Sequence, residues 1–401
     1  FYGNVIVDAG ATLTQPAGGY TTQANSGVSN NGTITSPFGG NTFRVKGGVF
    51  INNSSVSVQN LNFDTTTLII GTGTYTGQNI SIGSSGNVSL SNNVTFSPSS
   101  GFSVNSGGIL NPNAKIFTIN SGFLATNSGG TVTSSGTILT KNTVTLLNRN
   151  GSIFNGNLKV NNGTTSAYND QSPFLAYFNG PITVDAGATL TGGPGGYTLQ
   201  SNNTVTNNGI ITGTGTHNFR MKGSSFINNS SVTGYQLSFD STTTISGAGT
   251  FNPNYISIGG TGNLSLGSNV AFTPIVNFNL NNGGTLNPNG FTLTAIGNFY
   301  FQNGSNVSSS GTFRTQGSTS LFTKSGSSFN GTLKVNTGTT VCNDDGSPFI
   351  GNLYGAVTID TGATLTTYGG GYSLYLNNIV TNNGTLSCGG GANTRLFGTN
   401  L

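Results

Sequence analysis

Residues 1–13 read FYGNVIVDAGATL, and the chain repeats this stretch at 178–190 as FNGPITVDAGATL and at 353–365 as LYGAVTIDTGATL. Each copy has alternating apolar residues, then an Asp and a Gly, then a second short alternating run. Alternation with a period of two is typical of a half-buried β-strand. The sequence therefore predicts tandem blocks at 1–177 and 178–352, with 353–401 as the start of a third block of a longer chain.

A shorter period lies inside each block. Turn residues of the first block recur 21 or 22 residues apart, as at Gly10, Gly32 and Asn53 and again at Gly107 and Gly129. A fixed period of about 20–50 residues indicates a solenoid, a propeller or an array. A membrane barrel would need strongly apolar lipid-facing positions, whereas Thr, Ser and Asn dominate here, and the blade signatures of propellers are missing. We predict an all-β, right-handed parallel β-helix with about 22 residues per coil.

The composition excludes several classes of protein. Charged residues make up 5% of the chain, Glu is absent, and Gly accounts for 64 residues. The 26 Phe and 13 Tyr, with regularly placed Val, Ile and Thr, favour ordered β-structure over disorder. The twelve Lys and Arg are scattered rather than clustered, which argues against nucleic-acid binding. No apolar run reaches the roughly 20 residues of a membrane helix.

Repeat-equivalent residues are expected to have structural roles. Phenylalanines should stack inside the coils, aspartate side chains should bond to turn backbone, and asparagines should form ladders from coil to coil. The residues assigned to these roles are Phe50, Phe226, Phe63, Phe239, Asp8, Asp185, Asp360, Asn31, Asn208 and Asn383.

The sequence shows no catalytic motif. A carbohydrate-active enzyme would need a single cluster of carboxylates, but most Asp residues recur in each block. The only histidine, His217, is expected at the surface, and alone it makes neither a triad nor a zinc site. Asp344 and Asp345 together offer oxygen ligands of the kind that Ca²⁺ prefers, but no calcium-binding repeat accompanies them. We expect a protein that is not an enzyme and has no cofactor or metal.

Two patterns suggest binding. Tyr20, Tyr197 and Tyr372 each follow Gly-Gly, and we expect them to be exposed for contact with sugars or a partner. Thr-x-Thr segments such as 12–14 and 33–35 resemble the flat face of ice-binding solenoids. Because several coils lack the motif, a continuous array is not expected.

Cys342 and Cys388 are 46 residues apart, or about two coils. Coils are stacked about 4.8 Å apart, so two coils separate the pair by more than the roughly 7 Å that a disulfide spans. We therefore expect two free thiols unless the coils are offset.

Strand–turn units such as residues 31–35 (NGTIT) and 208–212 (NGIIT) resemble coils of bacterial surface adhesin stalks. The family is the β-helical passengers of filamentous haemagglutinin-like and autotransporter proteins. The resemblance covers the whole chain and implies export, a cell-surface location and a structural or adhesive role. We further expect the chain to form a homo-oligomer or filament with copies of itself and to have a glycan or other cell-surface target. The near-perfect blocks and the lack of Glu depart from this family and fit a long fibre built from one repeated unit. A carbohydrate-binding or carbohydrate-active β-helix and an ice-binding adhesin module are the alternatives.

Overall fold

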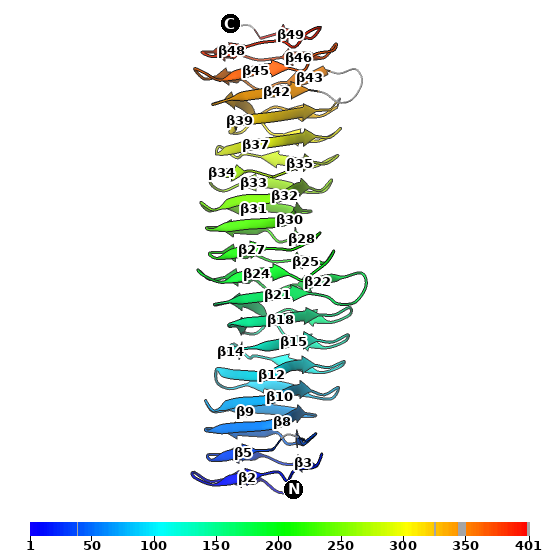
Figure 1. Cartoon of the computed structure of the whole chain (residues 1–401), viewed down its shortest axis with the longest axis vertical. Helices are drawn as coiled ribbons and strands as arrows, with labels where there is room; N and C mark the ends of the chain where they lie inside the picture. The colour runs from blue at the N-terminus through cyan, green and yellow to red at the C-terminus, as the bar shows by residue number, and fades with distance from the viewer. Residues whose placement is uncertain (38, 325, 344–349, 399–401) are drawn as a thin grey trace. The chain divides into compact units, whose positions relative to one another are not determined.

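A computed structural model describes residues 1–37, 39–324, 326–343 and 350–398. All regular elements in these residues are β-strands, as Figure 1 shows, so none of them is a helix that could cross a membrane. The contacts divide the chain into two compact units, Phe1–Asn203 and Thr204–Leu401, which are described separately.

The first unit contains strands β1 to β25. Their bounds are β1 Val5–Val7, β2 Thr12–Thr14, β3 Thr21–Ala24, β4 Val28–Asn30, β5 Thr33–Thr35, β6 Thr42–Val45, β7 Val49–Asn52, β8 Ser55–Phe63, β9 Thr66–Ile70, β10 Thr74–Ile82, β11 Asn87–Leu90, β12 Val94–Val104, β13 Ile109–Asn111, β14 Ile116–Ile119, β15 Gly122–Thr126, β16 Thr131–Val132, β17 Thr137–Thr140, β18 Thr143–Asn148, β19 Ile153–Phe154, β20 Asn157–Val160, β21 Thr164–Tyr168, β22 Leu175–Phe178, β23 Ile182–Val184, β24 Thr189–Gly192 and β25 Thr198–Ser201.

The second unit contains strands β26 to β49. Their bounds are β26 Val205–Asn207, β27 Ile210–Thr212, β28 Asn218–Met221, β29 Ser225–Asn228, β30 Ser231–Phe239, β31 Thr242–Ser246, β32 Thr250–Ile258, β33 Asn263–Leu266, β34 Val270–Phe272, β35 Asn277–Leu280, β36 Thr285–Asn287, β37 Thr292–Phe301, β38 Asn306–Val307, β39 Thr312–Thr323, β40 Ser328–Phe329, β41 Thr332–Val335, β42 Thr339–Asn343, β43 Ile350–Leu353, β44 Val357–Ile359, β45 Thr364–Thr367, β46 Ser373–Leu376, β47 Val380–Asn382, β48 Thr385–Leu386 and β49 Asn393–Leu396.

Both units are parallel β-solenoids. The three strands β1, β2 and β3 of the first coil pair in parallel with β4, β5 and β6 of the next. Thr12 is opposite Thr33 and Thr21 is opposite Thr42, in each case 21 residues further along the chain. In the second unit, β30 and β32 pair in the same way over most of their length. The predicted parallel β-helix is confirmed, and its right-handed winding stays a prediction.

The interior of each unit is lined with stacked aromatic and aliphatic side chains. Phe50, Phe63, Phe226 and Phe239 are fully buried, as predicted. The ring centroids of Phe50 and Phe63 are 6.1 Å apart, and those of Phe226 and Phe239 are 6.5 Å apart. Because each strand alternates inward and outward side chains, the apolar residues fill the core and Thr, Ser and Asn cover the surface.

Asparagine ladders occur at two depths. The outer one joins Asn53 Nδ2 to Asn31 Oδ1 at 2.9 Å, and its repeat joins Asn229 Nδ2 to Asn208 Oδ1 at 2.8 Å. For Asn383 the contact is one of the backbone only: its N–H donates to the Ile359 carbonyl, and its place in a side-chain ladder stays a prediction.

The inner asparagine ladder was not predicted. Asn30 and Asn52 are fully buried, and Asn30 Nδ2 donates to Asn52 Oδ1 at 2.8 Å and to the Ser55 carbonyl at 2.9 Å. Asn207 and Asn228 repeat the contact at 2.8 Å. The inner ladder thus satisfies the buried amide nitrogens of Asn30 and Asn207, whereas their amide oxygens have no hydrogen-bond partner within the described residues.

The expected surface position of His217 is wrong. Its side chain is 3% exposed. The ring lies against Gly213, where an added Cβ would be 2.4 Å from His217 Cδ2. Because Gly213 has no Cβ, the imidazole of His217 has space to pack in the interior.

The two cysteines are free thiols, as predicted. Cys342 is buried and Cys388 is exposed. Burial raises the pKa of the Cys342 thiol to about 12, because a thiolate is costly in an apolar surrounding.

Candidate functional site

The most distinctive surface feature of the first unit is the connection between β21 and β22, residues 169–174. Hydrogen bonds close it at its base: Asn169 Nδ2 donates to the Leu175 carbonyl at 3.1 Å, and Gln171 N donates to Asn169 Oδ1 at 2.9 Å. At its end, Phe174 N donates to the Gln171 carbonyl at 2.6 Å. The connection is therefore a defined loop, and loops on rigid scaffolds often carry binding residues.

An ion pair fastens this loop to the preceding coil. Arg149 Nε and one terminal nitrogen donate to the two Asp170 carboxylate oxygens at 2.7 and 2.6 Å. The other terminal nitrogen donates to Asn127 Oδ1 at 2.5 Å. The hydrogen bond from Arg149 lowers the pKa of Asp170, and the same contact raises the pKa of Arg149. Both groups are therefore charged together, in the bidentate geometry that fixes orientation best.

Three aromatic rings cluster beside the loop, and we call Tyr168, Phe174 and Tyr197 the aromatic loop site. The Tyr197 centroid is 5.1 Å from that of Tyr168 and 5.3 Å from that of Phe174, with Phe174 perpendicular to it. Phe174 is 42% exposed and has a φ of 58°. A bulky residue in this left-handed conformation is unusual, and such strain is concentrated at ligand-contacting positions. Burial raises the pKa of Tyr168, with a smaller contribution from Asp170.

The aromatic loop site contains one of the three tyrosines expected from the sequence. Tyr197 is half-buried at its centre. Tyr20 is 55% exposed and its ring covers Gly18. Tyr372 is half-buried, with its ring centroid 6.5 Å from that of the exposed Tyr368. Tyr168 and Phe174 were missed, because nothing in the sequence shows that the loop brings them to Tyr197.

The recurring aspartates have a structural arrangement. The turns are closed by the backbone carbonyls of Asp8, Asp185 and Asp360 rather than by their side chains as predicted, and these carbonyls accept from Ala11, Ala188 and Ala363, each at 3.0 Å. The carboxylate of Asp185 contacts Lys159 Nζ at 3.2 Å and Asn161 Nδ2 at 2.8 Å. That of Asp360 contacts Lys334 Nζ at 3.3 Å and Asn336 Nδ2 at 2.9 Å. The two blocks thus repeat the same ion pair.

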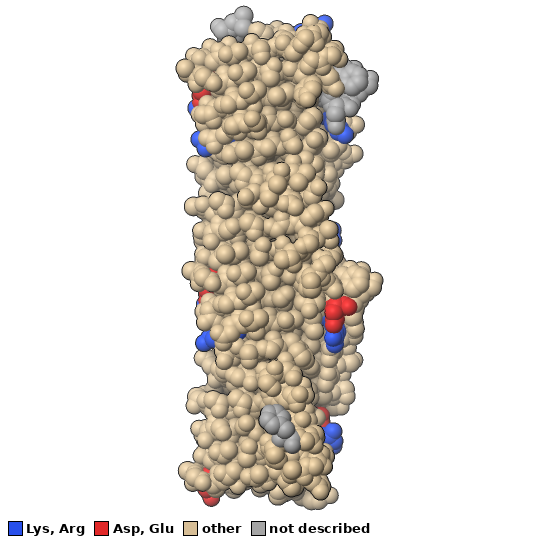
Figure 2. All heavy atoms as spheres, in the orientation of Figure 1, with Lys and Arg blue, Asp and Glu red and all other residues tan. Residues whose placement is uncertain are grey.

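Charge is sparse on the surface. Figure 2 shows acidic and basic atoms in a few small groups on an otherwise uncharged face. Arg44 with Asp64 and Arg220 with Asp240 form a second repeated pair. The carboxylates of Asp64 and Asp240 therefore each have a cationic partner.

Threonine and serine hydroxyls form two parallel columns on one face of the first unit. The inward residues between them are Leu13, Ile34, Val56, Tyr75 and Phe96. Each of five neighbouring strands contributes one residue to each of these hydroxyl columns. The pairs are Thr12 and Thr14, Thr33 and Thr35, Ser55 and Ser57, Thr74 and Thr76, and Thr95 and Ser97. The array is more continuous than the Thr-x-Thr motif alone indicates, because serine replaces threonine at three positions.

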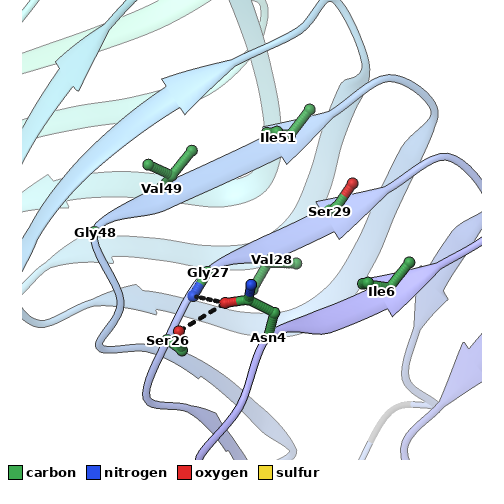
Figure 3. Close-up of a pocket in the computed structure, with 9 residues that line it drawn as sticks. All are labelled: Asn4, Ile6, Ser26, Gly27, Val28, Ser29, Gly48, Val49 and Ile51. Carbon is green, nitrogen blue, oxygen red and sulfur yellow. Dashed lines mark hydrogen bonds between the residues drawn. The ribbon is translucent and has the colours of Figure 1, made fainter.

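An apolar strip lies on the outward face of the sheet that contains β1, β4, β7 and β9. Its members, the apolar strip from here on, are Ile6, Val49, Ile51, Leu68 and Ile70. Ile6 is opposite Ser29, Ser29 is opposite Ile51, and Ile51 is opposite Ile70. Figure 3 shows Ile6, Ser29 and Ile51 following one another on three strands.

A groove of about 410 Å³ runs along part of this strip. Asn4 Oδ1 closes one side by accepting from Ser26 Oγ at 2.7 Å and from Gly27 N at 3.0 Å (Figure 3). Ile6 is 65% exposed and Val49 is 37% exposed. Exposed apolar patches of this kind typically mark contact surfaces.

No cluster of three metal-ligating side chains occurs in the described part of the chain, and Asp344 and Asp345 lie outside it. No protein-family model matches the sequence, and comparisons with curated proteins and with solved structures give no match. The relation to adhesin passengers therefore stays a resemblance.

Proposed function

We propose that this chain is a structural and adhesive segment of an exported bacterial cell-surface fibre. The main support is the parallel ladder within each unit, in which even the polar residues bond to the coil above or below. Stacked repeats of this kind resist local unfolding because each coil is held by both neighbours. The paired carboxylates further favour a role that is not enzymatic.

The aromatic loop site supports the adhesive part of the proposal. It presents an exposed Phe174 on a loop that Arg149 holds in place. Aromatic side chains offer large contact areas at a low entropy cost and dominate binding surfaces. Tyr20 and Tyr372 are the remaining candidates for such contacts.

Self-association through the apolar strip is the second part of the proposal. The strip carries no charge and matches the apolar face of a second copy better than a charged partner. Four of its five positions are polar in the second block, where Thr183, Ser225, Thr244 and Ser246 replace Ile6, Val49, Leu68 and Ile70. The apolar residues are therefore not required by the coil itself.

The experiment that tests the fibre is immunogold electron microscopy of intact producing cells, with an antibody raised against the folded chain. We expect labelled surface filaments with an axial repeat of about 40 Å, which is eight coils at about 4.8 Å each. Permeabilised cells are the control. Labelling that is confined to permeabilised cells would overturn both the location and the fibre.

Adhesion is tested with beads coated with the purified chain and allowed to settle on cells or surface glycans. Replacing Phe174 with Ala should reduce bead retention, whereas replacing the exposed Ile275, which is 67% exposed and far along the chain, should not. Equal retention for both variants would remove the aromatic loop site from the proposal.

Ice binding is a second candidate, favoured by the hydroxyl columns. Ten hydroxyl side chains on five strands form a regular array, about 4.8 Å between strands and about 6.7 Å along each strand. We expect the purified chain to inhibit ice recrystallisation, and Ser57→Tyr in the middle of the array to abolish the effect. Thr233→Tyr at the equivalent position of the second block is the control, because Ile210, Asn252 and Ala271 interrupt the columns there. Inhibition that survives Ser57→Tyr contradicts the assignment.

A further inference from the structure

We propose that a groove on the second unit binds one unit of a neutral oligosaccharide. The groove is lined by Tyr235, Gln236, Tyr255, Ser257 and Asn279, and we call it the tyrosine groove. Its residues come from β30, β32 and β35, which are neighbours in the ladder (Figure 1). The inference goes beyond the proposed fibre, because it concerns a ligand site that exists whether or not the chain forms filaments.

The two rings form one wall of the tyrosine groove. The centroids of Tyr235 and Tyr255 are 5.1 Å apart, with an angle of 60° between the ring planes. Both side chains are half-buried. The Tyr255 ring points outward, because its neighbour Ile256 is fully buried. Aromatic rings on a flat sheet provide an apolar surface against which the C–H face of a sugar ring can pack.

A bend in β30 places Tyr235 on this surface. Gly234 has a φ of 110°, which only glycine adopts easily. Its counterpart in the first block is Val58, which is buried. Gln59 and Asn60 of the first block are likewise two successive outward side chains, so this irregularity is common to both blocks and the second block uses it to present Tyr235 and Gln236.

The polar groups of the tyrosine groove are ordered but not fully used. Gln236 Nε2 donates to Ser238 Oγ at 3.1 Å and to Ser257 Oγ at 3.3 Å, and Ser257 Oγ donates to Ser238 Oγ at 3.0 Å. Within the described residues, the two phenol groups and the Asn279 amide make no side-chain hydrogen bond, and nothing donates to Gln236 Oε1. Outward donors and acceptors beside a ring match the hydroxyl groups of a sugar.

In the first block, the polar side chains at the equivalent surface hydrogen-bond to one another. Gln59 and Asn79 stand where Tyr235 and Tyr255 do in the second block. Gln59 Nε2 donates to Gln78 Oε1 at 3.0 Å, and Asn79 Nδ2 donates to Asn60 Oδ1 at 3.0 Å. The coil can thus be completed without tyrosines, so their presence in the second block is not explained by folding.

The volume and the lack of charge of the tyrosine groove restrict the class of ligand that it can bind. The tyrosine groove has a volume of about 260 Å³, below the roughly 300–1,000 Å³ of sites for drug-sized ligands, so it accommodates a single sugar unit of a longer chain. None of its five lining residues is charged. The nearby Arg220 is already paired with Asp240. These features favour neutral hexose or N-acetylhexosamine units over acidic ones.

The test is calorimetric and NMR titration of the purified chain with cellotetraose, mannotetraose and chitotetraose, and with an alginate tetramer as the acidic comparison. Tyr255→Asn and Tyr235→Gln introduce the residues of the first block, so the coil should remain folded by circular dichroism. The control is Tyr354→Asn on the same unit. Tyr354 is 45% exposed and lies far beyond the groove in the sequence, and its counterpart in the second block is Asn179.

We expect at least one neutral tetramer to bind, each groove variant to weaken that binding by about tenfold or more, and Tyr354→Asn to leave it unchanged. Binding by none of the neutral tetramers overturns the proposal. So does binding that is equal in all variants, which would place the sugar elsewhere on the chain. Binding of the alginate tetramer alone, lost on Arg220→Gln, would contradict the neutral assignment.

Discussion

Adjacent asparagines in the Asn-Asn doublets have different energetic roles. Asn30 is fully buried in the inner ladder, whereas its neighbour Asn31 is exposed in the outer one. Removing one partner of a buried hydrogen bond leaves the other unsatisfied, which costs more than the bond itself contributes. A surface amide exchanges its partner for water. Neighbouring residues of one type should therefore respond very differently to the same substitution.

Asn30→Ala should destabilise the chain by about 1–3 kcal/mol, because Asn52 Oδ1 and the Ser55 carbonyl would lose their donor. Asn31→Ala should change stability by no more than about 0.5 kcal/mol. Urea denaturation followed by circular dichroism measures both. Equal changes in the free energy of unfolding at the two positions would show that burial of the asparagine does not determine its contribution to stability.

The two thiols should differ in reactivity. Cys388 is exposed, whereas Cys342 is buried with its pKa raised to about 12. Near neutral pH a maleimide or disulfide reagent should modify one thiol per native chain and both after denaturation, because only the thiolate reacts. Mass spectrometry counts the adducts, and Cys388→Ser should abolish native labelling. Rapid native modification of Cys342 would mean that its coil opens readily.

At the scale of the element, the loop 169–174 is held by charge as well as by backbone bonds. Arg149 lowers the pKa of Asp170, so ionised Asp170 stabilises the closed loop above its unfolded pKa of about 4. That stabilisation is lost as the pH falls through the lower pKa of the folded state. The loop should therefore open at acidic pH while the coils remain paired.

Hydrogen exchange tests the acid response of the loop. We expect the protection of the Phe174 amide, which donates to Gln171, to fall below about pH 4. In Asp170→Asn the protection should be lower at neutral pH and nearly independent of pH. Asp8→Asn is the control, because Asp8 lies far from the loop in the sequence and should leave it unchanged. Unchanged protection in the wild-type protein at low pH would show that the Arg149–Asp170 ion pair does not hold the loop closed.

Sequence patterns predicted the elements better than the sites. Alternation and the regular turns indicated parallel coils, and repeat-equivalent Phe50 and Phe226 indicated the core. The hydroxyl columns were underestimated because serines fill positions where only threonine was counted, and because coil lengths vary enough to hide the register. Tyr168 and Phe174 were missed because their contact with Tyr197 depends on a loop conformation. His217 was misplaced because its burial depends on space left by Gly213, which periodicity does not report.

At the scale of the whole molecule, the two blocks have equivalent core residues and differ in their outward side chains. The first block carries the apolar strip and the hydroxyl columns, and the second carries the tyrosine groove. Because outward residues contribute little to the ladder, substitutions there alter binding without altering the coil. Each block is thus the natural control for the other.

Exchanging the apolar strip for its counterpart tests self-association. The variant Ile6→Thr, Val49→Ser, Leu68→Thr and Ile70→Ser should retain the β spectrum of the wild type, since the second block tolerates these residues. Sedimentation velocity should show concentration-dependent association for the wild type and loss of that association in the variant. If the wild type is monomeric, or if both associate equally, the strip is not the contact between copies.

The loop at 169–174 has a consequence for how such a protein diversifies. The ladder remains in register on both sides of it, with Thr164 opposite Thr189 and Leu175 opposite Thr198. Insertions and substitutions in this loop therefore leave the pairing of the flanking strands unchanged. Recognition and mechanical strength can then evolve at separate rates, in the way that hypervariable loops diverge on a constant scaffold, so that relatives with nearly the same coils would differ in what they bind.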